Sequence, residues 1–349
     1  MVMDFGNCPQ LGTALVQVFP ELGKSSNAKA MRWLKPDDTV ATMGRAFNIP
    51  VLDANYKPVK VRNIPILEDN PGELKALVTY IDYRRLVTPP IGILPVGLLS
   101  DQEMQQVEEF ITAITDVSIS EAFPELFIGE TERLSSGTNT FRDGIRKLRE
   151  RQVDEINKIS RRYRTLPVLN DNKALVGMLS YTNVLRKIQE HCERFLTKRV
   201  TDVYKKAEEL STLPGNKTLY KAAEILEPAL FTHLPIMKSE GSGIVTGIVD
   251  DLMVATYQHP LLFDSFKELS LKEIQTPVTD ENTVTPNNTV RDVIEKFLKI
   301  TFPDRPTAIL VCTKDTNGEF VLQGIVSYTD ILKKFELWRE GNIEHDREE

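Results

Sequence analysis

The sequence Gly-Ile-Val-Ser-Tyr-Thr-Asp at positions 324–330, followed by Ile-Leu-Lys-Lys-Phe at 331–335, contains the pattern on which the fold of this chain depends. Its apolar start predicts a buried strand, and the spacing of apolar residues after it predicts an amphipathic helix. Ser327 lies where this helix is expected to begin, and Asp330 follows three residues later. Both polar side chains would therefore lie at the positive end of a helix, where a phosphate or a sugar is favourably held.

The same pattern occurs at three other places, which is typical of a repeat protein. It is nearly identical at residues 177–183 and keeps its polar positions at 76–82, whereas residues 247–253 keep only the glycine and the apolar strand. A threonine predicted to cap a helix precedes each copy; these are Thr39, Thr140, Thr218 and Thr289. By subtraction of residue numbers, the separations from threonine to serine position are 40, 40, 32 and 38 residues. This recurrence predicts one structural unit repeated four times.

Each unit shows the same order of signals: a threonine-capped helix, a strand such as residues 166–169, a polar turn, the strand with Gly-x-x-Ser/Thr-x-x-Asp/Asn, and a closing helix. This order resembles that of cystathionine-beta-synthase (CBS) domains, and the four units cover most of residues 33–338. The resemblance implies an α+β fold with four CBS repeats (β-α-β-β-α) that are paired into two Bateman modules.

Spacing within the units groups repeat 1 with repeat 2, and repeat 3 with repeat 4. From the capping threonine to the residue two before the first apolar position of the strand, the separations are 23 and 24 residues in the first pair, against 14 and 16 in the second. We therefore expect an N-terminal extension at 1–32, a first module at 33–190, a second module at 191–340 and a charged tail at 341–349. The modules could stack into a disc within one chain, as in the gamma subunit of AMP-activated protein kinase, or the chain could form a homodimer.

Two segments lie outside the repeats. The extension at 1–32 predicts a short helix around residues 13–19 and has no function that its sequence indicates. Residues 88–132 form an insertion between repeats 1 and 2, with a helix predicted at 101–114 that Ser100 caps. Its apolar residues, at 104, 107, 111 and 114, would either pack on the first module or form a surface for a partner protein.

Composition narrows the class of protein. The net charge of −7 and the pI of about 5.4 argue against a nucleic-acid-binding protein that works through overall charge. Cys8, Cys192 and Cys312 are far apart and show no Cys-x-x-Cys spacing, which predicts reduced thiols and no zinc site. No apolar stretch approaches the ~20 residues that span a bilayer, and the N-terminus lacks the pattern of a signal peptide. We expect a cytoplasmic protein with no membrane insertion.

The resemblance also implies a ligand site, because the cleft between paired CBS repeats binds adenosine-containing ligands. The acidic or amide residue of the motif would accept hydrogen bonds from ribose, and the hydroxyl would contact ribose or phosphate. The matching pairs here are Thr79 with Asp82, Ser180 with Asn183, and Ser327 with Asp330. Repeat 1 departs from the pattern with Ala76 in place of glycine, which would narrow the approach of a base. Repeat 3 has Asp250 and Met253 at the two polar positions, so we expect its site to be empty or used differently.

A second aligned position also separates repeats 1, 2 and 4 from repeat 3. When the four strands are aligned on the runs that begin at residues 64, 166, 234 and 307, the position two residues before each run holds Arg62, Arg164, Thr232 and Arg305. The three arginines belong to the three repeats that keep the polar pair, and arginine binds phosphate in a bidentate manner. The alternative is purely structural, because Ser/Thr-x-x-Asp before an apolar run is also the capping box of a helix, and an arginine before a strand is often only a surface residue.

From these residues we expect a non-catalytic regulatory protein that senses AMP, ADP or ATP and passes the signal to a protein partner that the sequence does not identify. S-adenosylmethionine, NAD-type dinucleotides and cyclic dinucleotides stay open as ligands, although three arginines favour phosphate. The alternative is an interaction scaffold of CBS fold without a ligand. The chain contains no nucleophile–base pair, metal-ligand spacing or phosphate-binding Gly-x-x-x-x-Gly-Lys-Ser/Thr loop, so we expect neither enzymatic activity nor a bound metal.

Overall fold

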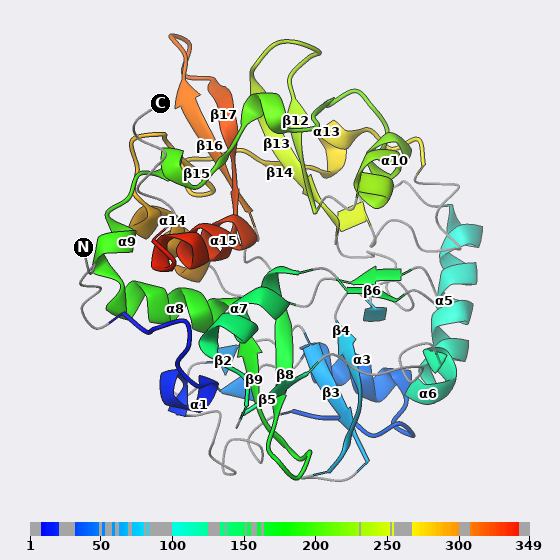
Figure 1. The fold of residues 1–349 in the computed structure, drawn as a ribbon. Helices are drawn as coiled ribbons and strands as arrows, with labels where there is room; N and C mark the ends of the chain where they lie inside the picture. Colours follow the sequence, from blue (N-terminus) through cyan, green and yellow to red (C-terminus); the bar gives the residue numbers. More distant parts are fainter. Residues whose placement is uncertain are drawn as a thin grey trace.

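A computed structural model of the chain (Figure 1) describes most of the four repeats. The described residues are 8–20, 32–48, 51–52, 58–59, 63–68, 72–79, 82–83, 100–124, 133–136, 138–150, 152–154, 159–161, 164–229, 232–251, 253–254, 267–299 and 308–341. Within them the chain forms small sheets with helices on their faces, which is the α+β class that the sequence predicts.

Each repeat is built around one antiparallel pair of strands. These pairs are β3 (Asn63–Leu67) with β4 (Leu74–Thr79), β8 (Thr165–Leu169) with β9 (Leu175–Ser180), β12 (His233–Met237) with β13 (Val245–Asp250), and β16 (Ala308–Lys314) with β17 (Phe320–Ser327). In every pair the last residue of the second strand occupies the serine position of the motif and lies opposite the first residue of the first strand. The motif residues therefore stand at the same end of each sheet.

A short strand extends each of three sheets in parallel: β5 (Leu134–Ser135) on β8, β11 (Leu213–Pro214) on β12 and β15 (Thr283–Val284) on β16. The threonine-capped helices are α3 (Val40–Asn48), α7 (Phe141–Arg149), α10 (Leu219–Ala229) and α14 (Val290–Lys299). In α7 the Thr140 hydroxyl accepts from the Asp143 N–H, and the buried residues recur at helical spacing as Phe141, Ile145 and Leu148. Two closing helices follow the motifs of repeats 2 and 4, α8 (Tyr181–His191) and α15 (Tyr328–Arg339).

The longer middle of repeats 1 and 2 forms an additional hairpin in each. Strands β1 (Val51–Leu52) and β2 (Pro58–Val59) pair in repeat 1, and β6 (Gln152–Asp154) and β7 (Ile159–Arg161) pair in repeat 2. Both hairpins lie between the capped helix and the first long strand, where the residue counts of the two pairs of repeats differ. The difference in spacing is thus the length of one small hairpin.

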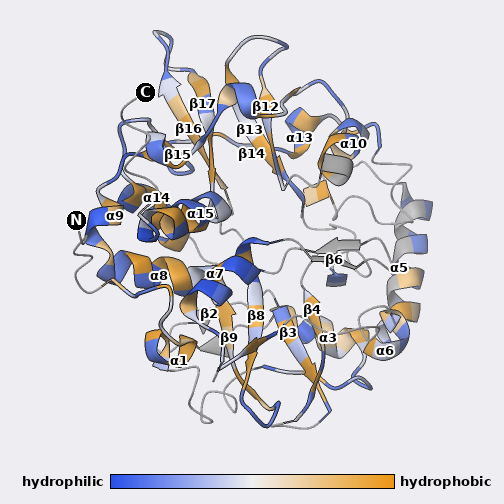
Figure 2. Ribbon diagram, viewed as in Figure 1, coloured by the Kyte–Doolittle hydropathy of each residue, from blue (hydrophilic) through white to orange (hydrophobic). Residues whose placement is uncertain are grey.

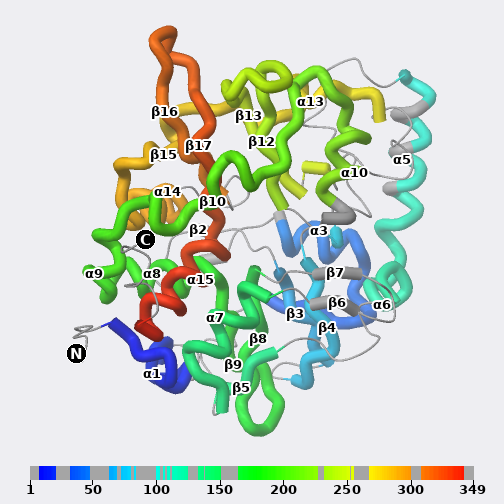
Figure 3. Tube along the Cα trace, turned by 45° about the horizontal axis from the view of Figure 1, so that its top comes forward, coloured from blue at the N-terminus to red at the C-terminus, as the bar shows by residue number. Residues whose placement is uncertain are grey.

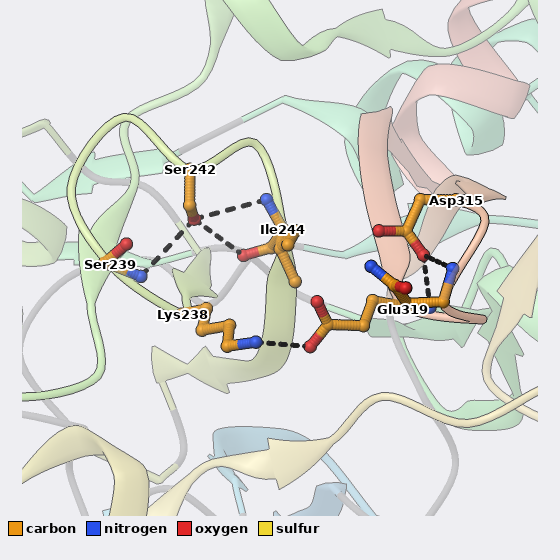
Figure 4. Close-up of polar contacts among 7 residues, drawn as sticks. Lys238, Ser239, Ser242, Ile244, Asp315 and Glu319 are labelled. Carbon is orange, nitrogen blue, oxygen red and sulfur yellow. Dashed lines mark hydrogen bonds and ion pairs between the residues drawn. The ribbon is translucent and has the colours of Figure 1, made fainter.

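Sheet faces join the repeats in pairs. Leu67 and Leu74 of repeat 1 pack against Leu169 and Leu175 of repeat 2, and a second apolar cluster joins the sheets of repeats 3 and 4. In the second module the turns of both hairpins also meet, where Lys238 Nζ bonds Glu319 Oε1 at 2.5 Å (Figure 4). Ser242 and Asp315 order the two turns through hydrogen bonds to backbone N–H groups, at Ile244 and Glu319 respectively among others (Figure 4). The pairing of sheets is the organisation of two Bateman modules.

Within each module a segment that precedes one repeat packs on the other repeat. Helix α1 (Leu15–Val18) lies beside Thr140 of repeat 2, and α6 (Ile119–Ala122) lies beside Thr39 of repeat 1. In the second module the segment with α9 (Glu193–Leu196) and a 3-10 turn (Val200–Asp202) reaches Thr289 of repeat 4, and α13 (Leu271–Ile274) reaches Thr218 of repeat 3. Residues 8–19 and 116–123 are therefore equivalent parts of the repeat architecture and not unrelated additions.

The helix predicted in the insertion is present as α5 (Asp101–Thr115). It runs along one side of the molecule and contacts α3 (Figures 1 and 3). Ile114 packs against the hydrophobic core of repeat 1, as the packing alternative predicts. The side chains at positions 104, 107 and 111 lie outside the described residues, so a partner surface there stays a prediction.

The largest hydrophobic core joins the two modules. It contains buried residues of α7 and α8 from repeat 2, of α14 and α15 from repeat 4, and of residues 8–19. Phe335 of α15 lies between Phe141 and Phe195, with ring centroids 6.1 Å and 5.3 Å away. Figure 2 shows hydrophobic residues along α8 and α14, which lie against each other in the middle of the molecule. The two modules thus stack on each other within one chain, which is one of the two arrangements expected from the resemblance.

A disulfide bond links Cys8 to Cys192, across 184 residues of sequence. It ties the N-terminal segment to the end of α8, and both cysteines are part of the large core. The expectation of reduced thiols is therefore wrong for this pair, because the fold brings together two cysteines that the sequence keeps far apart. Cys312 is the free cysteine and is buried in β16.

Candidate functional site at the convergent motif ends

The polar pair of repeat 4 is a complete capping box. The Ser327 N–H and hydroxyl both donate to Asp330 Oδ2, at 2.8 Å and 2.5 Å, and the Asp330 N–H donates to Ser327 Oγ at 3.3 Å. Repeat 2 repeats this geometry with Ser180 and the side-chain oxygen of Asn183. Both serine hydroxyls also contact a threonine hydroxyl two residues later, at 2.7 Å in each case. These pairs are half-buried at the start of a helix, where backbone N–H groups point outward.

Repeat 1 has the same reciprocal bonds, whereas repeat 3 does not. Thr79 donates from its N–H and its hydroxyl to Asp82 Oδ2, at 2.9 Å and 2.7 Å. In repeat 3 the Asp250 carboxylate caps the helix start by accepting the Met253 N–H at 2.7 Å. An acidic cap stabilises the helix but offers no hydroxyl to a ligand and repels phosphate. The structure thus divides the repeats as the sequence does.

The motif ends of repeats 1 and 2 lie together within the first module. Asn63 Nδ2 donates to the Thr165 carbonyl at 3.1 Å, which joins the first residues of β3 and β8. Since Asn63 lies opposite Thr79 and Thr165 lies opposite Ser180, the two hydroxyl residues stand at the same end of the paired sheets.

The motif ends of the two modules meet in the centre of the molecule. Tyr181, which follows Ser180, stacks on Tyr328, which follows Ser327, with ring centroids 4.3 Å apart and an interplanar angle of 24°. Both rings are buried. In Figure 1 the corresponding ends of β8, β13 and β17 point toward this central region. The three pairs predicted as ligand contacts therefore lie at sheet ends that converge on one region.

Arg164 is the described arginine at the aligned position that is predicted to bind phosphate, since Arg62 and Arg305 lie outside the described residues. It is only 8% exposed, and its Nη2 bonds Asp251 Oδ1 of repeat 3 at 3.1 Å. Burial acts to lower the pKa of Arg164, but the Coulombic interactions with its neighbours, of which Asp251 contributes most, outweigh it, so the pKa lies above its ordinary value. The guanidinium is thus a firmly charged group that crosses from the first module to the second.

Three central residues have no role in the sequence-based prediction: Tyr181, Tyr328 and Asp251. A signal for them exists, because the position after the motif hydroxyl is tyrosine in repeats 1, 2 and 4 and is Asp251 in repeat 3. The tyrosine is therefore kept and lost together with the polar pair. What the pattern lacks is any indication that two of these tyrosines face each other.

Other segments of the chain pack closely against two of the motif glycines, Gly324 and Gly247. A Cβ on Gly324 would lie 2.1 Å from the Lys205 carbonyl oxygen and 2.2 Å from the Tyr204 ring, because β10 (Lys205–Lys206) pairs along β17. A Cβ on Gly247 would meet the Gln275 side chain at 2.4 Å, beside β14 (Thr276–Pro277). In these two repeats the glycine serves the close approach of an edge strand and the residue before it.

A surface hollow of about 280 Å³ lies elsewhere, lined by Arg133, Leu134, Ser135, Leu169, Asn170, Asp171 and Lys173. It sits at the opposite end of β8 from Ser180, so it is not the predicted site. Among the described residues no group of three His, Cys, Asp or Glu side chains could hold a metal ion. No helix in the described part of the chain is long and apolar enough to cross a membrane.

Comparisons with known proteins agree with this architecture. The family model "CBS domain" matches residues 140–190 and 271–337, which contain the motifs of repeats 2 and 4. No curated protein sequence matches the chain. Protein MJ1225 from Methanocaldococcus jannaschii, which has been proposed as an archaeal homologue of γ-AMPK, is similar in structure, with a TM-score of 0.57 and 14% identity. The match covers 93% of this chain and 100% of MJ1225 and shows a shared fold.

Two shorter proteins each match about two-fifths of the chain. CBSX2 from Arabidopsis thaliana in complex with AMP has a TM-score of 0.32 and 16% identity, and the match covers 41% of this chain and 98% of CBSX2. The CBS domain pair of MJ0100 in complex with 5-methylthioadenosine and S-adenosyl-L-methionine has a TM-score of 0.31 and 24% identity, with 40% and 97% covered. With TM-scores this low, the ligands of these two proteins do not indicate what this chain binds. The chain therefore contains CBS domains at residues 140–190 and 271–337, and its paired sheets give it the fold of two Bateman modules.

Proposed function

We propose that the protein is a non-catalytic regulatory protein that binds AMP, ADP or ATP at the motif ends of repeats 1, 2 and 4. The observation that carries this proposal is the convergence of these ends on one central region that also contains a buried, charged arginine. Repeat 3, which lacks the polar pair, has its own carboxylates there and takes no phosphate. A change of ligand at this place would alter the contact between the modules, which a protein partner could read.

Asp330 can contact a nucleotide while its capping box stays intact. Both hydrogen bonds from Ser327 go to Asp330 Oδ2, and among the described residues Oδ1 accepts none, so Oδ1 can accept from ribose hydroxyls. Asp82 and Asn183 are also proposed to contact ribose; the single side-chain oxygen of Asn183 already accepts from the Ser180 N–H and hydroxyl, so we expect its contact to be the weaker one. Thr79, Ser180 and Ser327 are proposed as hydroxyl contacts. Arg62, Arg164 and Arg305 are proposed to bind phosphate, which a guanidinium binds in a bidentate manner.

Isothermal titration of the full chain with AMP, ADP, ATP and S-adenosylmethionine tests the proposal directly. We expect binding of at least one phosphate-bearing nucleotide and a matching rise in melting temperature. Asp330→Ala should weaken that binding because it removes the ribose acceptor of repeat 4. Absence of binding by any of these ligands would refute the sensor function.

The chain offers a matched control for Asp330. Asp292 forms an equally complete capping box with Thr289 in the same repeat, with Thr289 N–H to Asp292 Oδ2 at 2.7 Å, but this box lies at the start of α14, away from the motif. Asp292→Ala should therefore lose a similar stability of ~1 kcal/mol and leave nucleotide affinity unchanged. If both variants lose affinity equally, the effect of Asp330 is only structural.

The second candidate is an interaction scaffold of CBS fold, in which the motif pairs serve only as helix caps. Two observations favour it: each described pair is satisfied internally, and the chain's own Tyr204 covers Gly324. This candidate predicts that no adenine nucleotide changes the melting temperature. A cytoplasmic location stays a proposal. The Cys8–Cys192 disulfide argues against it, because disulfides are rare in reducing compartments.

A further inference from the structure

At the motif of repeat 3, which lacks the polar pair, a side chain from the first module binds. This motif carries two neighbouring carboxylates, Asp250 and Asp251, where repeats 2 and 4 have serine and tyrosine. Asp250 caps its helix, and Asp251 bonds the guanidinium of Arg164 from the predicted phosphate-binding position of repeat 2. The repeat that lost its own ligand pattern therefore holds a cation that repeat 2 would present to phosphate.

The surroundings of Arg164 explain why this cation needs an anion. Within the described part of the chain, the titratable groups that act on it are Asp251 and Asp250 of repeat 3, Tyr181 of repeat 2 and Tyr328 of repeat 4. At neutral pH only the two carboxylates among these carry charge. The guanidinium side chain is 9% exposed, and a buried charge without a partner is strongly unfavourable. The Asp251 side chain is 32% exposed, so the carboxylate side of the pair is in contact with solvent.

We infer that Asp251 competes with phosphate for Arg164 and thereby determines how strongly repeat 2 prefers a phosphate-bearing ligand. This inference rests on the proposed function in so far as the phosphate belongs to a nucleotide held by Ser180 and Asn183. When the phosphate accepts the N–H donors of Arg164, Asp251 loses its partner and turns to solvent. Ligand binding in the first module then removes a contact with the second, which couples occupancy to the arrangement of the modules.

Asp251→Asn tests the inference, because it removes the charge and keeps the size of the side chain. Without an added anion this variant should melt at a lower temperature than the wild type, since Arg164 remains buried without the carboxylate that it is hydrogen-bonded to. Inorganic phosphate and AMP should each raise its melting temperature more than that of the wild type. The Kd for AMP should fall roughly ten- to a hundredfold, the value of one hydrogen-bonded charge pair, while binding of adenosine should not change.

Two controls separate competition for Arg164 from general loosening. The double variant Arg164→Met/Asp251→Asn lacks the cation, so phosphate and AMP should give it no additional stabilisation. Glu336→Gln weakens a different ion pair between the modules, with Arg146 and Arg149, and leaves Arg164 untouched. Its response to phosphate and AMP should equal that of the wild type.

The outcomes distinguish this inference from the proposed function. A gain with inorganic phosphate that disappears in the double variant supports the inference, even if AMP binds none of the proteins and the nucleotide proposal fails. Equal responses of Asp251→Asn and wild type to phosphate and AMP would overturn the inference. An equal gain in Glu336→Gln would overturn it too, because the gain would then come from loosening of the modules.

Discussion

At the scale of single residues, the motif serines and aspartates act first on their own backbone. Ser327 and Asp330 satisfy two N–H groups at the start of α15, which a helix would otherwise leave to solvent. That use is complete without a ligand and explains why these residue types occur at this spacing. A ligand role therefore depends on what surrounds the pair, above all on the tyrosines and on Arg164.

Cys312 provides a prediction about pH at this scale. Burial raises the pKa of the Cys312 thiol from 9.0 to about 12. The unfolded chain ionises this thiol near pH 9 while the folded chain keeps the proton, so the stabilising contribution is fully present below pH 9 and is lost as the pH rises to 12. We expect the free energy of unfolding in urea to fall over this window by up to about 1.4 kcal/mol per pH unit.

A Cys312→Ala variant is the control, and the quantity to compare is the change in the free energy of unfolding with pH. Cys312→Ala should lower stability at every pH because it leaves a small cavity, but it should lose the slope that the thiol contributes. Cys8 and Cys192 do not titrate while they form a disulfide. Parallel slopes for the variant and the wild type would contradict the prediction.

At the scale of elements, helices and central strands follow from local patterns, and edge strands do not. The buried stripe of α7 and the capping box at Thr140 are readable from spacing and residue type. Strands β10 and β14 have only two residues each and pair with β17 and β13 from distant segments. Their presence is indicated only by the motif glycines that they cover.

Gly324→Ala tests this account of the edge strand. A methyl group would meet the Lys205 carbonyl oxygen at 2.1 Å, and backbone cannot move aside as a side chain can. We expect a loss of about 1–3 kcal/mol in the free energy of unfolding, measured by urea denaturation, because β10 must shift away from β17. Gly12→Ala is the control, since a Cβ there meets nothing within 4 Å and should change stability by about 0.5 kcal/mol or less. Similar losses in both variants would be incompatible with close strand packing as the cause.

At the scale of the whole molecule, ion pairs around the buried Glu336 hold the modules together. Glu336 of α15 is 4% exposed and bonds Arg146 and Arg149 of α7, at 2.8 Å and 3.1 Å. Arg142 of α7 and Glu340 extend the contact at 3.0 Å. These contacts join the helices of repeats 2 and 4 next to the aromatic core, so they fix how the modules stack.

Glu336→Gln should destabilise the protein by about 2 kcal/mol, since it removes the charge that two arginines share in a buried position. Urea denaturation of the full chain measures the change. Glu319→Gln is the matched control, because it removes a single ion pair, with Lys238, in which both side chains are at least one-third exposed. The control should lose less than about 1 kcal/mol. If Glu319→Gln costs as much as Glu336→Gln, burial is not the reason for the effect.

The disulfide should contribute about 2–5 kcal/mol, because it closes a long loop in the unfolded chain. Cys192→Ser should lower the melting temperature, and a reducing agent should lower that of the wild type similarly while having no further effect on the variant. Thiol titration in denaturant should find one free thiol before reduction and three after it. Three free thiols in the unreduced protein would show that the bond does not form.

The sequence by itself determined the number of repeats, the capped helices, the buried stripes and the positions of the motif pairs. These features follow from interactions within one turn of helix or one pair of strands, so they leave a local signature. It also indicated that repeat 3 differs, since its hydroxyl, its arginine and its tyrosine are all absent.

Only the tertiary structure decided which of these residues meet. The stacking of Tyr181 on Tyr328, the pairing of Arg164 with Asp251 and the bond from Cys8 to Cys192 each join segments of different units. Such contacts depend on how the modules pack through α7, α8, α14 and α15, and no spacing along the chain encodes them. The residue types were visible in the sequence, but their partners were chosen by the burial of hydrophobic faces between modules.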